Sequence, residues 1–264
     1  MLKVRVIPTL LWIGPGLVKG VGFDSWRRVG PVLPAMKVYN HREVDELVIV
    51  DIEAHRATLA EDLDYESITD FGRECSVPLT VGGGIRRLEQ VQHLLRAGAD
   101  KVCVNSAAYT RPELLSDIAD RFGSQCVVAS IDVRGDAATG WQCHSHAGTR
   151  PTGRNVVAWA REVEARGAGE ILLTSIERDG TMAGYDLALI DAVCSEVGIP
   201  VIASGGAGTY GHMVDAVVRA NASAVAAASM FHFTEQTPLG AKAALEAAGV
   251  PVRRQFASSM PAAA

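Results

Sequence analysis

Two glycine pairs stand where the chain could bind anions. Gly83-Gly84 follows the apolar stretch LTVG and Gly205-Gly206 follows VIAS, and each pair precedes a segment with helical periodicity. Backbone N–H groups beside glycine can approach an anion closely, and a helix amino terminus adds a favourable partial charge. In each half of the chain the next apolar stretch ends in a small hydroxylated residue, as part of Asn105-Ser106 or Ala228-Ser229. The pattern predicts two phosphate sites.

One carboxylate and one cation add to this candidate chemistry. Asp132 ends the apolar stretch CVVASID, and a carboxylate held in such a place can give or take a proton. Lys19 follows residues 14–16, whose sequence GPG predicts a loop. The first apolar stretch, by contrast, ends in the residues LLW at 10–12, so its end is apolar where polar chemistry would be expected.

The apolar stretches recur along the chain and alternate with amphipathic segments. Runs typical of buried strands lie at 4–11, 46–52, 78–83, 101–105, 126–132, 170–176, 200–206 and 223–229. Between them apolar residues repeat every three or four positions, as at 88–97 and 156–166. Strands that alternate with helices over about 250 residues indicate a (β/α)₈ barrel, with a doubly wound open sheet as the competing fold. The glycine pairs and Asp132 would then share the carboxyl face.

The two halves of the sequence resemble each other. Residues 77–108 resemble residues 199–230, and the prolines and glycine pairs of the two segments are 122 positions apart. A duplicated unit of strands and helices closes naturally into a ring. We therefore expect one barrel domain at 1–254, made of half-barrels at about 1–122 and 123–250, with a disordered tail at 255–264.

Composition narrows the possible partners. The 264 residues are 48% hydrophobic and 21% charged, which is enough apolar sequence for a large core. The formal net charge of −5 argues against a nucleic-acid partner. No apolar run approaches the roughly 20 residues of a membrane span and the amino terminus has no signal-peptide pattern, so we expect a cytoplasmic protein. The 5 cysteines are scattered without CxxC spacing, which predicts reduced thiols and no metal site.

Longer motifs resemble one known family. They are LTVGGGI at 79–85, GADKV at 98–102, FGSQCVVASID at 122–132, GAGEILLTSIERDGT at 167–181, IASGGAG at 202–208 and FHF at 231–233. The chain resembles the cyclase subunit of imidazole glycerol phosphate synthase, a histidine-pathway barrel. That subunit takes ammonia from a glutaminase partner and closes an imidazole ring on a substrate carrying two phosphates. The resemblance implies a heterodimer with a glutaminase, a small phosphorylated ligand and no cofactor.

The resemblance also implies roles for single residues. One phosphate is expected at Gly84, Asn105 and Ser106, and the other at Asp179, Gly180, Gly206 and Ser229, with Lys19 as the lysine of the substrate loop. Ammonia is expected to enter from the amino-terminal face past a ring of alternating charges, at Arg5, Glu46, Lys101 and Glu170. The catalytic pair of the family is formed by aspartates that end strands one and five, and Asp132 matches the second of them.

Leu11 occupies the position of the first catalytic aspartate. Leucine neither gives nor takes a proton, and loss of a positioned acid or base typically lowers the rate by about 10²- to 10⁴-fold. Asp24 and Asp51 are the candidates to replace it. A barrel with the ammonia ring kept and one aspartate lost resembles paralogues from bacterial surface-polysaccharide gene sets. In those sets a glutaminase, a cyclase-like barrel and an ATP-dependent ligase convert a sugar N-acetyl group to an acetamidino group.

The leading hypothesis is therefore a synthase subunit that passes ammonia through the barrel for amidination of an N-acetylated sugar, with the ligase as a further partner. One alternative is an active cyclase subunit of histidine biosynthesis, in which another carboxylate covers for Leu11. A second is a non-catalytic barrel that docks a glutaminase. The long connection after Asp132 is expected to hold a surface hairpin that carries His144 and His146.

Overall fold

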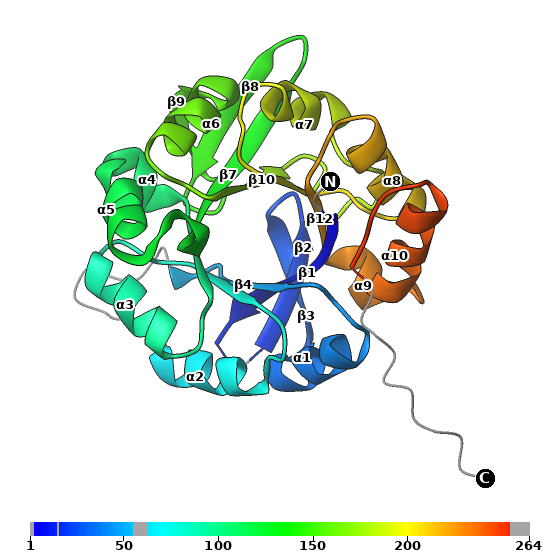
Figure 1. The fold of residues 1–264 in the computed structure, drawn as a ribbon, viewed down its shortest axis with the longest axis horizontal. Helices are drawn as coiled ribbons and strands as arrows, with labels where there is room; N and C mark the ends of the chain where they lie inside the picture. The colour runs from blue at the N-terminus through cyan, green and yellow to red at the C-terminus, as the bar shows by residue number, and fades with distance from the viewer. Residues whose placement is uncertain (1–2, 15, 55–62, 254–264) are drawn as a thin grey trace.

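The strands close into the predicted barrel. The computed structural model describes residues 3–14, 16–54 and 63–253. The ring consists of β1 (Arg5–Ile13), β4 (Leu47–Asp51), β5 (Leu79–Gly82), β6 (Lys101–Val104), β7 (Val127–Asp136), β10 (Glu170–Ser175), β11 (Val201–Ser204) and β12 (Ala224–Ala227). Neighbours are parallel, β7 pairs with β10, and β12 pairs with β1 (Figure 1), so no edge remains. The fold is a (β/α)₈ barrel, and every predicted strand run is confirmed.

Helices cover the outside of this ring (Figure 1). They are α1 (Val32–His41), α2 (Tyr65–Glu74), α3 (Leu88–Arg96), α4 (Ser106–Thr110), α5 (Glu113–Phe122), α6 (Val156–Ala165), α7 (Leu187–Cys194), α8 (Tyr210–Val218), α9 (Ser229–Phe233) and α10 (Pro238–Ala247), with the 3₁₀ turn η2 (Ser124–Cys126). In α6 the side chain of Asn155 accepts hydrogen bonds from the first backbone N–H groups, while Val156, Trp159 and Val163 are buried. The spacing of these apolar residues turns one face of the helix toward the strands.

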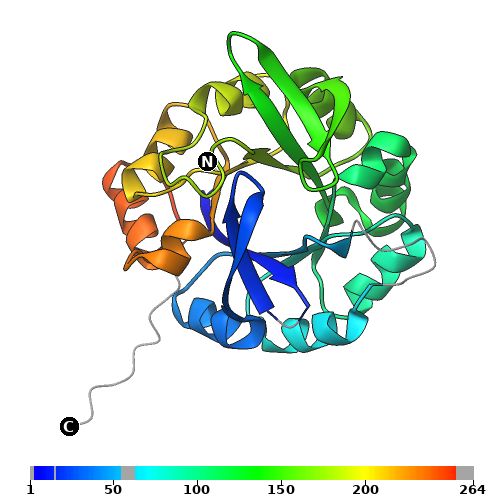
Figure 2. The ribbon, with the colours of Figure 1, turned by 180° about the vertical axis from the view of Figure 1, so that it is seen from behind.

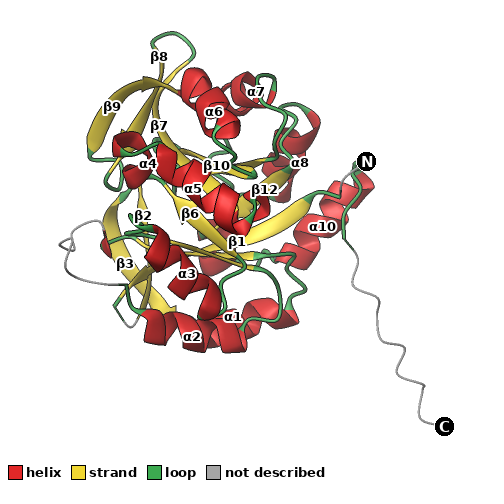
Figure 3. Cartoon of the chain, turned by 60° about the vertical axis from the view of Figure 1, so that its left-hand side comes forward, coloured by secondary structure: helices red, strands yellow, loops and turns green. Residues whose placement is uncertain are grey.

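Two antiparallel hairpins are added to the barrel strands. β2 (Gly16–Val21) and β3 (Asp24–Pro31) extend β1, and β8 (Gly140–Ser145) and β9 (Arg150–Asn155) extend β7. The β2–β3 hairpin lies in front of the barrel mouth in Figure 2, and the side view in Figure 3 places both hairpins on the side away from the N-terminus.

The prediction of a loop before Lys19 is wrong. Residues 11–13 of β1 pair with residues 16–18, so the chain continues as a tight hairpin, and Lys19 lies within β2. Leu17 and Val18 are buried, which explains why this segment forms a strand and not a solvated loop. The hairpin predicted after Asp132 is confirmed, and it is larger than expected because β7 itself extends into it.

The inside of the barrel has its own apolar layer, separate from the core between strands and helices. The inner layer consists of Ile7, Val48, Cys103, Val128, Leu172, Ile202, Ala224 and Ala226. Burial raises the pKa of the Cys103 thiol to about 12, so this side chain is neutral within the layer. The layer separates the amino-terminal end of the barrel from the carboxyl end.

The sequence predicts no membrane span, no metal site and a disordered tail. Within residues 3–14, 16–54 and 63–253, no helix combines the length and apolarity that a bilayer crossing requires. The same residues contain no group of three or more His, Cys, Asp or Glu side chains that could hold a metal ion. The tail predicted at 255–264 lies outside the described residues.

Candidate functional site

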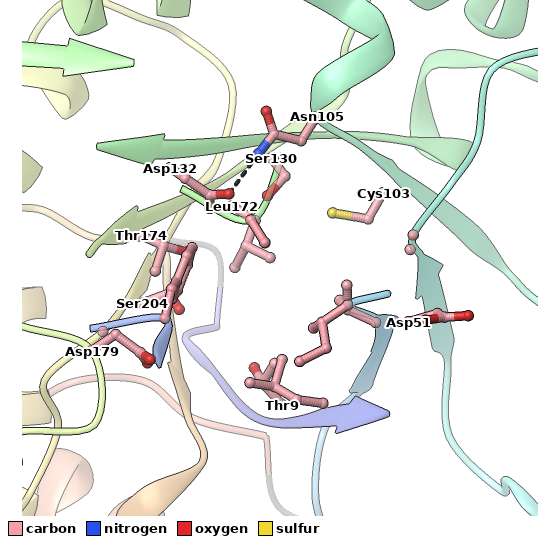
Figure 4. Close-up of a pocket in the computed structure, with 18 of the residues that line it drawn as sticks. Thr9, Asp51, Cys103, Asn105, Ser130, Asp132, Leu172, Thr174, Asp179 and Ser204 are labelled. Atoms are coloured by element: carbon pink, nitrogen blue, oxygen red, sulfur yellow. Dashed lines mark hydrogen bonds between the residues drawn. The ribbon is translucent and has the colours of Figure 1, made fainter. Parts of the chain in front are cut away.

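A pocket of about 700 Å³ opens at the carboxyl ends of the barrel strands. It is lined by all the residues predicted for this face: Leu11, Lys19, Gly84, Asn105, Ser106, Asp132, Asp179, Gly180, Gly206 and Ser229. The lining comes from both halves of the chain, because closure of the ring brings the ends of distant strands together. Figure 4 shows Asp132 and Asp179 on one side of this pocket and Asp51 on the other.

The glycine pairs leave bare backbone at the pocket wall. Gly84 has a φ of 67° and Gly206 a φ of 109°. A Cβ atom on Gly206 would lie 2.2 Å from the carbonyl oxygen of Gly184, and one on Gly84 would lie 2.7 Å from the Cβ of Ala54. Only glycine fits these two positions, so each predicted phosphate site is bordered by main chain without side chains.

At the phosphate site predicted in the first half of the chain, two side chains already have hydrogen-bond partners within the protein. The Nδ2 of Asn105 donates a hydrogen bond of 2.6 Å to Oδ2 of Asp132, and Oγ of Ser106 accepts one of 2.9 Å from the backbone N–H of His146. Asn105 therefore orients Asp132, in addition to its place at the predicted phosphate site. Ser106 fixes the turn between β8 and β9 at the edge of the pocket.

His146 lines the pocket, although we expected it on a surface hairpin. The β8–β9 turn folds over α4, and its positive φ of 53° at His146 turns the chain back toward Ser106. The signal that could have identified it is the length of the connection after Asp132, since long loops at the carboxyl face often reach the substrate.

At the phosphate site predicted in the second half of the chain, Asp179 forms an ion pair with Lys19. Nζ of Lys19 donates to Oδ2 of Asp179 at 2.6 Å, and the lysine side chain is only 2% exposed. The N–H of Asp179 is directed to the carbonyl oxygens of Ser175 and Ile176, at 3.0 and 3.2 Å. A carboxylate repels phosphate, so in this geometry Asp179 would serve a phosphate through Lys19 and not by direct contact.

Asp132 has the electrostatic environment of a proton-transfer group. Burial, and to a lesser degree the nearby Asp179, raise the pKa of its carboxyl to about 7, although the hydrogen bond from Asn105 opposes both effects. A group with a pKa near neutrality can both give and take a proton under physiological conditions.

Asp51 and Asp24, the two candidates to replace the carboxylate expected at position 11, are held by other contacts or lie elsewhere. Oδ1 of Asp51 accepts hydrogen bonds from the N–H groups of Glu53 and Ala54, at 2.9 and 3.0 Å, which caps the turn after β4. In Figure 4 the Asp51 carboxylate points away from the centre of the pocket. Asp24 lies at the exposed start of β3. Leu11 thus leaves the end of β1 without a group that transfers protons.

At the opposite end of the barrel four charged side chains form a closed ring, which we call the ionic ring: Arg5, Glu46, Lys101 and Glu170. Arg5 Nη1 lies 2.7 Å from Glu46 and 3.0 Å from Glu170, and Lys101 Nζ lies 3.0 Å and 3.2 Å from the same two carboxylates. Thr80 donates a further hydrogen bond of 2.9 Å to Glu46. The ionic ring lies below the inner apolar layer, at the amino-terminal ends of the strands.

The fold and the site together define a class: a (β/α)₈ barrel with glycine-lined strand ends, a buried aspartate at its carboxyl face and an ionic ring at its amino-terminal face. The sequence matches the family described as "Histidine biosynthesis protein" over residues 5–237. The imidazole glycerol phosphate synthase subunit HisF of Gluconacetobacter diazotrophicus is 48% identical over 261 residues, which cover 99% of this chain and 100% of that protein. The chain belongs to the HisF family of histidine biosynthesis proteins.

The comparisons confirm the predicted resemblance to the synthase family. They favour the histidine-pathway alternative over the sugar-amidination hypothesis, because the family and the relative carry names from that pathway. The resemblance to acetamidino-sugar paralogues receives no support from them.

Replacing Glu46 with glutamine is expected to lower the free energy of unfolding by about 3–5 kcal/mol, as measured by urea denaturation. The change leaves Arg5 and Lys101, which are 12% and 16% exposed, with Glu170 as their shared carboxylate. Glu196→Gln is the control, because its partner Arg161 is 61% exposed and such pairs contribute at most about 1 kcal/mol. Equal effects of the two substitutions would show that the ionic ring is not a buried network.

Proposed function

We propose that this chain is the synthase subunit of a glutamine-dependent imidazole glycerol phosphate synthase and works with a glutaminase subunit. Ammonia enters through the ionic ring, crosses the inner apolar layer and reaches the pocket, where it reacts with a small phosphorylated substrate. The observation that carries this proposal is the order of side chains along the barrel axis: charged ring, apolar layer, buried carboxylate. The full-length identity to a HisF subunit supports it.

The apolar layer selects neutral ammonia over the ammonium ion. Moving a charged ammonium ion into an environment lined by residues such as Ile7, Val48 and Val128 is far more costly than moving neutral ammonia. The species that arrives at the pocket is therefore the nucleophilic one, with its lone pair free. The charges of the ionic ring lie where ammonium must lose its proton before it enters.

In this proposal the pocket residues bind and orient the substrate. One phosphate lies against Gly84, Asn105 and Ser106, and the other against Gly180, Gly206 and Ser229. The Lys19–Asp179 pair flanks the second site, and Asp132 exchanges protons with the reacting centre. With Leu11 at the end of β1, ring closure depends on this one carboxylate.

A second candidate function follows from Leu11. Without the second catalytic carboxylate, ring closure would be reduced or absent, while the ionic ring and the apolar layer would still conduct ammonia. The barrel would then pass ammonia to an ATP-dependent ligase that amidinates an N-acetylated sugar. This candidate uses the same route and differs only in the final acceptor.

The test is product formation by the complex with its glutaminase, supplied with the bisphosphate substrate and either glutamine or an excess of ammonium salt. We expect product in both cases, and Lys101→Met should lower the glutamine-dependent rate more than the ammonium-dependent rate, because added ammonia reaches the pocket directly. A wild-type complex that makes no product from either source would exclude ring closure and leave the relay. Unchanged glutamine-dependent product in Lys101→Met would favour a barrel that only docks the glutaminase.

A further inference from the structure

Four hydroxyl-bearing residues line the bottom of the pocket and have no role in the function proposed above. Thr9 of β1, Ser130 of β7, Thr174 of β10 and Ser204 of β11 form what we call the hydroxyl ring. Each lies two positions beyond a member of the inner apolar layer, at Ile7, Val128, Leu172 and Ile202. Since side chains alternate along a strand, both sets point into the barrel, and the hydroxyl ring forms the next layer above the apolar one.

The hydroxyl ring also lies next to the reacting carboxylate. Thr174 is the register partner of Asp132 across β7 and β10, and of Ser204 across β10 and β11. Figure 4 shows Ser130, Thr174 and Ser204 near Asp132, whereas Thr9 lies lower in the view and farther from that carboxylate. Ser130, two positions before Asp132 on β7, therefore lies nearer the apolar layer than Asp132, and Thr174 lies level with that carboxylate on the next strand.

One hydroxyl of this ring has hydrogen-bonding capacity that the described residues do not use. Oγ1 of Thr9 is buried and has no hydrogen-bond partner among the described residues. Buried polar atoms without a partner are uncommon in native proteins, because each costs the free energy of its desolvation. The Thr9 hydroxyl is thus a buried polar group with unused hydrogen-bonding capacity at the bottom of the pocket.

We propose that the hydroxyl ring is a binding site for neutral ammonia at the exit of the apolar layer; this rests on the proposed ammonia route. Ammonia accepts one hydrogen bond through its lone pair and donates three, and a hydroxyl can play either part. The ring itself carries no formal charge, and the apolar layer that leads to it excludes ammonium, so the species that it receives is ammonia. Bound there, ammonia waits below the substrate beside Asp132.

The site can be tested without any turnover, by NMR of the protein with carbon-13-labelled threonine methyl groups. The probe is ammonium chloride, added at neutral pH and at alkaline pH where part of it is ammonia, with sodium chloride at the same pH as the salt control. We expect the methyl signals of Thr9 and Thr174 to shift and saturate with the concentration of neutral ammonia alone. Thr69 and Thr234, whose hydroxyls donate to the carbonyl oxygens of Tyr65 and Met230, serve as internal controls.

Two variants sharpen the test. Thr174→Val should weaken the saturating response at Thr9 several-fold, and Ser204→Ala should do the same at both threonines. If neither threonine shows a saturable shift, or if both variants respond like the wild type, the inference is wrong. A saturable shift in a protein that forms no imidazole product would leave the ammonia site intact and exclude only ring closure, whereas product without any shift would overturn only the ammonia site.

Discussion

Leu11→Asp is expected to raise the ammonium-dependent rate of ring closure by about 10²- to 10⁴-fold over the wild type. Leu11 lines the pocket at the end of β1, so an aspartate there supplies the second proton-transfer group, across from Asp132. The measurement is steady-state turnover of the bisphosphate substrate with an excess of ammonium salt. Because ammonia is added directly, the result does not depend on the glutaminase.

Leu11→Asn is the matched control, since it has nearly the same shape and polarity but cannot exchange a proton. Only the aspartate variant should gain activity. A wild type that already turns over at the rate of Leu11→Asp would show that the carboxylate at this position is unnecessary and that another group replaces it. Inactivity of all three proteins would favour delivery of ammonia to a different acceptor.

Asp132→Asn is expected to lower turnover by about 10²- to 10⁴-fold, because Asp132 is the carboxylate proposed to exchange protons with the reacting centre. The wild-type rate should change with pH around a single inflection near neutrality, since the pKa of Asp132 is raised to about 7. This inflection should be missing from the residual activity of the variant. An unchanged pH profile would assign the inflection to another group and remove Asp132 from the mechanism.

Asp132→Asn is expected to raise the stability of the protein although it lowers turnover. A loss of turnover in this variant therefore cannot be caused by unfolding. The folded protein holds the Asp132 proton up to about pH 7, whereas the unfolded chain releases it near 3.8, so the wild type becomes less stable as the pH rises between these values. Asparagine removes this penalty and can still accept the hydrogen bond from Asn105. We expect Asp132→Asn to be more stable above neutral pH, by on the order of 1–4 kcal/mol, with little gain in acid.

The barrel could be predicted because its signals are local. Each strand run, such as residues 170–176, is a short β-branched stretch, and the repeat at 122 positions shows that the units come in two sets. The residues that line the pocket could be predicted for the same reason, since the carboxyl ends of all strands must meet at one face of a closed ring. The identity of Leu11 as the exceptional residue is likewise readable from the sequence alone.

The partners of these residues could not be predicted from the sequence. Lys19 and Asp179 are 160 positions apart and form a buried ion pair, and Arg5 reaches Glu170 across 165 positions. Such contacts depend on how far each strand is staggered against its neighbours and on where the hairpins fold, which no short-range periodicity encodes. For the same reason the sequence predicts a loop before Lys19 and a surface position for His146, whereas the structure places Lys19 within β2 and His146 at the pocket.

The sequence by itself thus determined the type of fold, the family and the loss of a carboxylate at Leu11, because each of these is written in residue identities and local spacing. The tertiary structure alone decided the hydrogen bond from Asn105 to Asp132, the raised pKa of that carboxyl, and the hydroxyls that line the pocket with it. These features arise from burial and from side chains on different strands, and both exist only once the ring is closed.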